Sequence, residues 1–291
     1  MLTLVLPCVG GAVAALVHWL VFSRIIEQPL FARQNYRGRT VPVAGGLVLM
    51  AAVLTVAALH AVSRAALLAT DAKGAESLSR TLLAVLGFGV VGLVDDIAGP
   101  GDPTGGQARG FKGHVAAALR GELSTGMVKL LGGAAVAAVV VPVVKSGVDA
   151  FARDVVLVAL AANLANLLDR RPGRVLKVGL LCAVPLVVLA ASPVLLSGAA
   201  AVAGAGLALL GFDVREKLML GDGGANAVGA ALGLAVVLAF SPDVRLVVLI
   251  VLVVLNAVSE VVSFSTVIDR VPPLRYVDHL GRVRGEGSAG G

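Results

Sequence analysis

Nine runs of apolar residues follow one another along the chain, separated by short stretches rich in charged residues, glycine and proline. A helix needs ~20 apolar residues to cross the hydrocarbon core of a bilayer, and most of the runs approach that length. The runs cover residues 2–22, 42–63, 81–94, 127–144, 155–168, 176–191, 193–211, 224–240 and 244–264. We therefore predict an all-α, polytopic integral membrane protein with about nine to ten transmembrane helices. Residues 1–284 would form a single membrane domain, followed by a disordered tail, 285–291.

The composition agrees with a membrane protein. The 291 residues are 58% hydrophobic with a mean hydropathy of +0.95, which is more apolar than a soluble domain requires. Two cysteines, Cys8 and Cys182, both lie within apolar runs, so the sequence indicates neither a disulfide framework nor a thiolate metal site. The net charge of +6 is spread over short loops and does not indicate nucleic-acid binding.

The distribution of positive charge predicts the orientation. Eighteen of the 24 Lys and Arg residues fall on the side that carries residues 23–41, and six fall on the other side. Because cytoplasmic loops carry an excess of Lys and Arg, the first side should be cytoplasmic. We therefore expect a multi-pass protein of the cell (inner or plasma) membrane, with its N-terminus outside and its C-terminus in the cytoplasm.

Two adjacent carboxylates, Asp95 and Asp96, end the apolar run 81–94. Ionisable groups at such a place need water, a metal or a positive partner, and neighbouring carboxylates repel each other. Hard oxygen ligands of this kind suit Mg²⁺, which also binds substrate phosphates. The alternative interpretation is a solvated helix end. A Gly/Pro-rich loop with Lys112 follows the pair and offers a cation for a phosphate.

Three polar residues, Asn163, Asn166 and Asp169, are spaced by three and share a broad helical face. Within an apolar run they need partners from the protein or from a ligand, so interhelical hydrogen bonding is the alternative to a site. The basic stretch that follows contains Arg171 and Arg174, which are candidates for pairing with phosphates.

Three further stretches fall on the predicted cytoplasmic side. Gly221 and Asp222 precede the eighth apolar run, where an acid suits either helix capping or metal binding and glycine allows a ligand to approach the backbone. Arg37 precedes a glycine pair that begins a helix, which is typical of an anion-binding corner but also of ordinary positive-inside charge. His279 lies in the C-terminal segment, where a surface position is the ordinary alternative.

In this order, the stretches resemble motifs of the polyprenyl-phosphate N-acetylhexosamine-1-phosphate transferase family. The resemblance spans roughly residues 30–280 and rests on four stretches: Pro42…Gly45-Gly46, Val94-Asp95-Asp96, Asn163…Asn166…Asp169 and Gly221-Asp222-x-Gly224. It implies an active site in cytoplasmic loops that transfers a sugar-1-phosphate from a UDP-sugar to a membrane polyprenyl phosphate and releases UMP. This would serve cell-envelope glycan synthesis. Phosphoryl transfer requires mainly positioning and charge neutralisation.

The resemblance also implies roles for individual residues. Asp222, with Asn166, would bind Mg²⁺, or Mn²⁺ in its place, and Asp95 or Asp96 would orient or deprotonate the lipid phosphate. Asp169 and His279 match catalytic positions, and Asn163, Asn166 and Gly221 match substrate-binding ones. Our own candidates for pairing with phosphates are Arg37, Lys112, Arg171 and Arg174. A homodimer is compatible with such a bundle.

The sequence also departs from the family pattern. Pro172 replaces a second acid, Met219 replaces an aromatic before Gly-Asp, and a single histidine, His279, replaces a cluster. These changes affect nucleotide and sugar recognition and argue against a pentapeptide-bearing substrate. The alternatives are a membrane scaffold or regulator that has the fold without activity and, with less support, a transporter built from broken helices.

Overall fold

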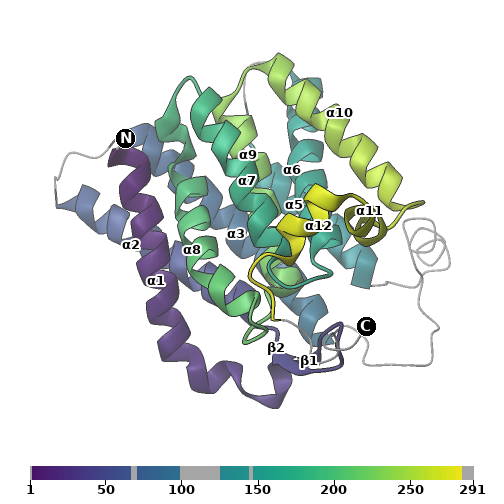
Figure 1. The fold of residues 1–291 in the computed structure, drawn as a ribbon. Helices are drawn as coiled ribbons and strands as arrows, with labels where there is room; N and C mark the ends of the chain where they lie inside the picture. Colours follow the sequence, from purple (N-terminus) through teal and green to yellow (C-terminus); the bar gives the residue numbers. More distant parts are fainter. Residues whose placement is uncertain (1, 67–70, 99–124, 144–146, 284–291) are drawn as a thin grey trace.

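The computed structural model describes residues 2–66, 71–98, 125–143 and 147–283. The long helices are α1 (Leu2–Ile26), α2 (Gly45–Ala65), α3 (Ala72–Ala98), α5 (Thr125–Val140), α6 (Val148–Leu168), α7 (Arg174–Leu189), α8 (Ser197–Asp213), α9 (Gly221–Ala239) and α10 (Pro242–Ser259). Two short helices, α11 (Phe264–Arg270) and α12 (Pro272–His279), follow α10. Two 3-10 turns, η1 (Pro29–Phe31) and η2 (Pro193–Leu196), and two strands, β1 (Ala32–Gln34) and β2 (Thr40–Pro42), complete the described elements (Figure 1).

Each of the nine apolar runs falls on one of the helices α1–α3 and α5–α10, which confirms the helical class. Within the described ranges, seven helices are long and apolar enough to cross a membrane, so the chain is a multi-pass membrane protein; α5 and α7 have 16 residues each. In such helices every backbone hydrogen bond is made within the segment, as a bilayer demands. The predicted tail 285–291 lies outside the described residues.

Two features of the structure were not predicted. The first is the antiparallel hairpin β1–β2, in which Ala32 pairs with Pro42 and Gln34 with Thr40. The second is that α3 begins at Ala72 and α9 at Gly221, each before its apolar run. As a result Asp222 lies in the first turn of α9 rather than in a preceding loop. The continuation of α3 past its polar end, which includes Asp95 and Asp96, is as the sequence predicts.

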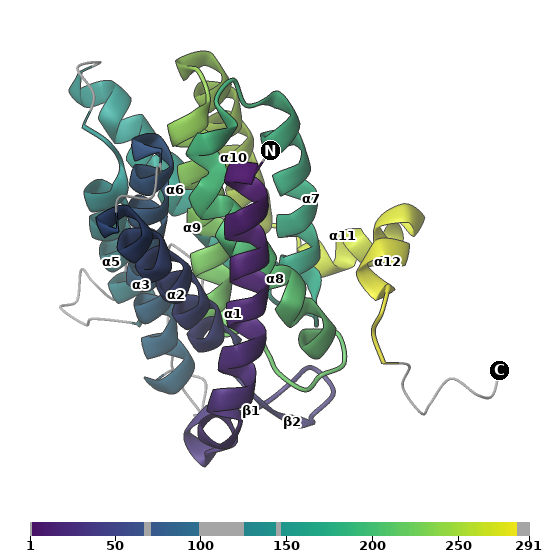
Figure 2. The ribbon, with the colours of Figure 1, turned by 90° about the vertical axis from the view of Figure 1, so that its left-hand side faces the viewer.

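The bundle is built around α9. Of the apolar stretch of α9, 83% is buried, against 6% for α10, which lies at the outside. Helices α2, α3, α6, α7 and α8 all pack on α9. The N-terminus of α1 lies at one end of the bundle and the hairpin β1–β2 at the other (Figure 2). The hairpin end therefore carries the starts of α2 and α9 and the ends of α3 and α6.

Candidate active site

The start of α9 is held by the end of α3. Asp96 Oδ1 accepts a hydrogen bond from the backbone N–H of Asp222, and Asp96 Oδ2 accepts one from Gly223, both at 2.9 Å. These N–H groups would otherwise lack a partner within the helix, and a carboxylate also complements the positive end of the helix dipole. A Cβ on Gly92, one turn earlier, would lie 2.5 Å from the Asp222 carbonyl carbon. The absence of a side chain at Gly92 thus allows the two backbones to meet.

At the same junction, one lysine ammonium group contacts two carboxylates. The Nζ atom of Lys129, from the first turns of α5, contacts a carboxylate oxygen of Asp95 and one of Asp222. All three side chains are about a quarter exposed, between 23% and 28%. One ammonium group therefore compensates two carboxylates that come from different helices. Asp95 and Asp96, although adjacent, have different roles, because the first binds this lysine and the second caps α9.

The glycine-rich start of α2 packs on the same end of α9. The backbone N–H groups of Gly45 and Gly46 donate to the carbonyl oxygens of Met219 and Leu220, at 3.0 and 2.9 Å. A Cβ on Gly45 would lie 2.8 Å from the Cα of Leu220. Gly221 adopts a positive φ of 72°, which favours glycine, at the point where the chain enters α9. Three of the four stretches predicted to act together are thus in direct contact.

The fourth stretch, on α6, approaches from another side of α9. Asn166 Nδ2 donates to Asn226 Oδ1 of α9 at 3.3 Å, which leaves the Asn166 carbonyl oxygen available as a ligand. Asp169 caps the end of α6. Burial raises the pKa of Asp169 well above its usual value of 3.8, and the negative charges of Asp213, Asp222 and Asp96 add to this effect. Asp169 is therefore electrostatically coupled to the carboxylates at the α3–α9 junction.

Asn163 lies one helical turn further into the predicted membrane. Its side-chain amide donates to Asn256 Oδ1 of α10 at 2.7 Å, and Asn256 Nδ2 donates to the Leu160 carbonyl oxygen at 3.3 Å. Asn163 thus makes the interhelical hydrogen bond that was the alternative to a substrate-binding role.

The predicted phosphate-binding arginines have unequal positions. Arg174 is 2% exposed and donates through Nε and Nη2 to the two carboxylate oxygens of Asp278, at 2.8 and 3.0 Å. The Nε atom of Arg37 lies 3.4 Å from Oε1 of the buried Glu216 carboxylate. Both arginines have an acidic partner, and we do not retain Arg174 among the candidates for phosphate. Arg171 makes no ion pair in the described part of the chain, and Lys112 lies outside the described residues.

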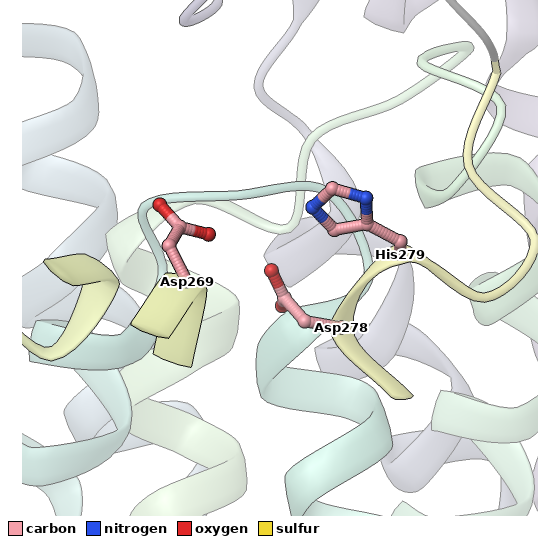
Figure 3. Close-up of side chains that lie close together, drawn as sticks. All are labelled: Asp269, Asp278 and His279. Atoms are coloured by element: carbon pink, nitrogen blue, oxygen red, sulfur yellow. The ribbon is translucent and has the colours of Figure 1, made fainter. Parts of the chain in front are cut away.

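His279 lies in the C-terminal segment with Asp269 and Asp278, and their nearest ligand atoms are within 4.8 Å of one another (Figure 3). Arg174 and Arg282 already compensate Asp278, so this group has little free negative charge to offer a cation. Helices α12 and α5 lie on opposite sides of the bundle (Figure 2). The structure therefore does not bring His279 to the carboxylates that Lys129 joins.

Lys129 is the residue that sequence reasoning missed. In the sequence, Lys129 is one of the eighteen basic residues on the predicted cytoplasmic side, with no further role indicated. A lysine in the first turns of an apolar helix does carry a signal, because its charge needs a partner when the helix is packed against others. We define Asp95, Asp222 and Lys129 as the carboxylate centre, with Asp96, Asn166 and Asp169 around it.

Comparison with known proteins adds no assignment, since neither the models of protein families nor the curated proteins give a match to this chain.

Proposed function

We propose that this protein transfers a sugar-1-phosphate, of the N-acetylhexosamine class, from a UDP-sugar to a polyprenyl phosphate at the cytoplasmic face of the cell membrane. The observation that supports this most is that three of the four sequence-distant stretches meet at the carboxylate centre at one end of a membrane bundle, and that the fourth bonds through Asn166 to α9, one turn beyond Asp222. These are the stretches that carry the family resemblance. A site at a bundle end suits a reaction between a soluble nucleotide sugar and a lipid.

In the reaction, an oxygen of the lipid phosphate attacks the phosphorus attached to the sugar, and the bond from that phosphorus to UMP breaks. The chain's own residues need to position two anionic partners and neutralise their charge. Lys129 supplies positive charge at the centre, and Asp95 orients the attacking phosphate from the end of α3. Asp96 holds the start of α9, so Asp222 stays beside Asp95.

The donor set fits a divalent cation. Asp95 and Asp222 present carboxylate oxygens close enough to share one positive group, as their contact with Lys129 demonstrates. Asp222 and Asp95, with the side-chain carbonyl of Asn166, would hold Mg²⁺ or Mn²⁺, since both ions prefer oxygen ligands. The ion would supply further neutralisation of the phosphates.

A second candidate function is a scaffold or regulator of the same architecture. The contact of Lys129 with two carboxylates favours it, because the lysine compensates the acidic centre without any ligand. The departures at Pro172 and Met219 also favour it, since both would lie where the family recognises its substrates.

A UMP-exchange assay separates the two functions. Membranes that contain the purified full chain are supplied with polyprenyl phosphate, Mg²⁺, radiolabelled UMP and each member of a panel of UDP-sugars. We expect label to enter one UDP-sugar, and we expect Asp222→Asn to abolish this exchange. The matched control is Asp243→Asn, which removes an exposed acid from the first turn of α10 at the other end of the bundle. Absence of exchange with every sugar, with folding intact, would favour the scaffold.

A further inference from the structure

A pocket of about 450 Å³ lies beside the end of α6, where the chain turns from α10 into α11. It is distinct from the carboxylate centre, and no acid is among its lining residues. The lining is formed mainly by two arginines, three serines and an aromatic ring: Arg170, Arg171, Ser259, Ser263, Ser265 and Phe264. The pocket therefore concentrates positive charge and hydroxyl groups in one place.

The two arginines have no counter-ion among the residues that the structure describes. Within the described part of the chain, neither Arg170 nor Arg171 makes an ion pair or a side-chain hydrogen bond. Their neighbours differ, since Arg174 and Arg282 both pair with Asp278. Two guanidinium groups that line the same pocket repel each other, and an anion in that pocket would relieve the repulsion.

Arg171 is also held in position. The ring of Tyr36, from the turn between β1 and β2, lies 4.3 Å from the Arg171 guanidinium carbon. Stacking of this kind fixes the plane of the guanidinium without neutralising its charge. The N–H donors of Arg171 thus remain free for a planar or tetrahedral oxyanion.

The serines supply further donors. Ser265 Oγ accepts a hydrogen bond from Arg174 at 2.9 Å, so its own hydroxyl hydrogen is free to donate. Ser263 makes no side-chain hydrogen bond in the described residues, even at the start of α11. Ser259 differs, because its hydroxyl donates to the Asn256 carbonyl oxygen at 2.6 Å. It therefore lines the pocket without offering a free donor.

We propose that this pocket binds a phosphate group through Arg170, Arg171, Ser263 and Ser265. Arginines and hydroxyls in combination are typical ligands of phosphate, and guanidinium groups bind it through paired hydrogen bonds. A phosphate here comes either from a membrane lipid headgroup or from a soluble nucleotide. The proposal does not depend on transferase activity, because binding is its only requirement.

The test measures binding to the purified full chain in neutral-lipid nanodiscs. One arm titrates uridine diphosphate, and the other adds nanodiscs that contain dioleoyl phosphatidate in place of phosphatidylcholine and counts bound lipid by native mass spectrometry. The variant is Arg170→Gln/Arg171→Gln. Its matched control is Arg215→Gln/Lys217→Gln, which removes two exposed charges from the same end of the bundle outside the pocket.

We expect one probe to bind the wild type and to bind the pocket variant at least tenfold more weakly, since each charge-assisted hydrogen bond contributes about that factor. The control variant should bind as the wild type does. Ser263→Glu, at an exposed position, should weaken binding as well, because its carboxylate would form ion pairs with Arg170 and Arg171 in place of the phosphate. The arm in which this loss appears identifies the source of the phosphate.

Two outcomes would overturn the proposal. Equal weakening in the pocket variant and the control would mean that the probe senses only the general positive charge of this end. Failure of both probes to bind the wild type would mean that the arginines serve only the C-terminus of α6, whose dipole favours positive charge. Unchanged thermal unfolding of the variants excludes misfolding as the cause of any loss.

Discussion

The contact of Gly92 with the first turn of α9 leads to a prediction that depends only on packing. In Gly92→Ala, the new Cβ would lie 2.5 Å from the Asp222 carbonyl carbon and 2.6 Å from the Gly223 Cα. Both atoms belong to the backbone, so the helices must separate by about 1 Å to reach ordinary contact. Overpacking of this kind costs about 1–3 kcal/mol, against a gain of up to about 1 kcal/mol in helix propensity. We expect a net loss of about 1–2 kcal/mol in the free energy of unfolding.

The matched control is Gly211→Ala in α8, where the new Cβ would lie 3.6 Å from Arg215 Nη1, an ordinary contact. Here only the propensity gain applies, so the two alanines should shift the thermal midpoint in opposite directions. Thermal unfolding of the purified proteins in one detergent compares them directly. A midpoint of Gly92→Ala at or above that of Gly211→Ala would refute the close approach of α3 and α9. Because the approach also positions Asp96, UMP exchange should fall in Gly92→Ala alone.

Three further predictions concern charge. Lys129→Met should lower UMP exchange by about 100-fold, which corresponds to about 2.7 kcal/mol of barrier. The thermal stability of this variant should also depend more strongly on Mg²⁺ than that of the wild type, because Asp95 and Asp222 then lack the lysine ammonium group. Burial alone would raise the pKa of Asp278, but hydrogen bonds and charges from its arginine partners outweigh burial and lower the pKa below 3.8. The stabilisation that Asp278 provides is therefore present above pH 3.8 and lost as pH falls further. Amide hydrogen exchange of α12, corrected for intrinsic rates, should accelerate below that pH. In Asp278→Asn the amides of α12 should exchange fast at every pH. In a background without native cysteines, Arg215→Cys should resist a membrane-impermeant thiol reagent in intact cells and Ser241→Cys should react, and the reverse result would invert the orientation.

The helices could be predicted because each follows from local composition. A run of apolar residues without internal charges specifies a membrane helix almost regardless of its neighbours, and all nine runs became helices. The boundaries were less predictable, since α3 begins at Ala72 and α9 at Gly221, each before its apolar run. The ends of a helix depend on partners elsewhere in the chain, and Asp96 is itself such a partner for α9.

The site was predictable only in part, because its contacts join distant positions. Lys129 and Asp222 are 93 positions apart, and nothing local to either residue indicates the other. The arginines from 170 to 174 look alike in sequence, yet Arg174 is buried against Asp278 whereas Arg171 stacks on Tyr36. Which of several neighbouring cations has an acidic partner is decided by the fold and not by the local sequence.

The packing of α1 against α8 sets an order for assembly of the protein during synthesis. The backbones touch at two places, where Gly11 meets Ala201 and Gly204 meets Cys8. Although α1 also packs on α2, its Gly11 meets α8 only after some 190 further residues have been made, about 10–40 s at ordinary rates of chain elongation. Until α8 has been made, the face of α1 that carries Cys8 and Gly11 lacks its helix partner, and a truncated chain that ends before α8 would leave that face uncovered permanently.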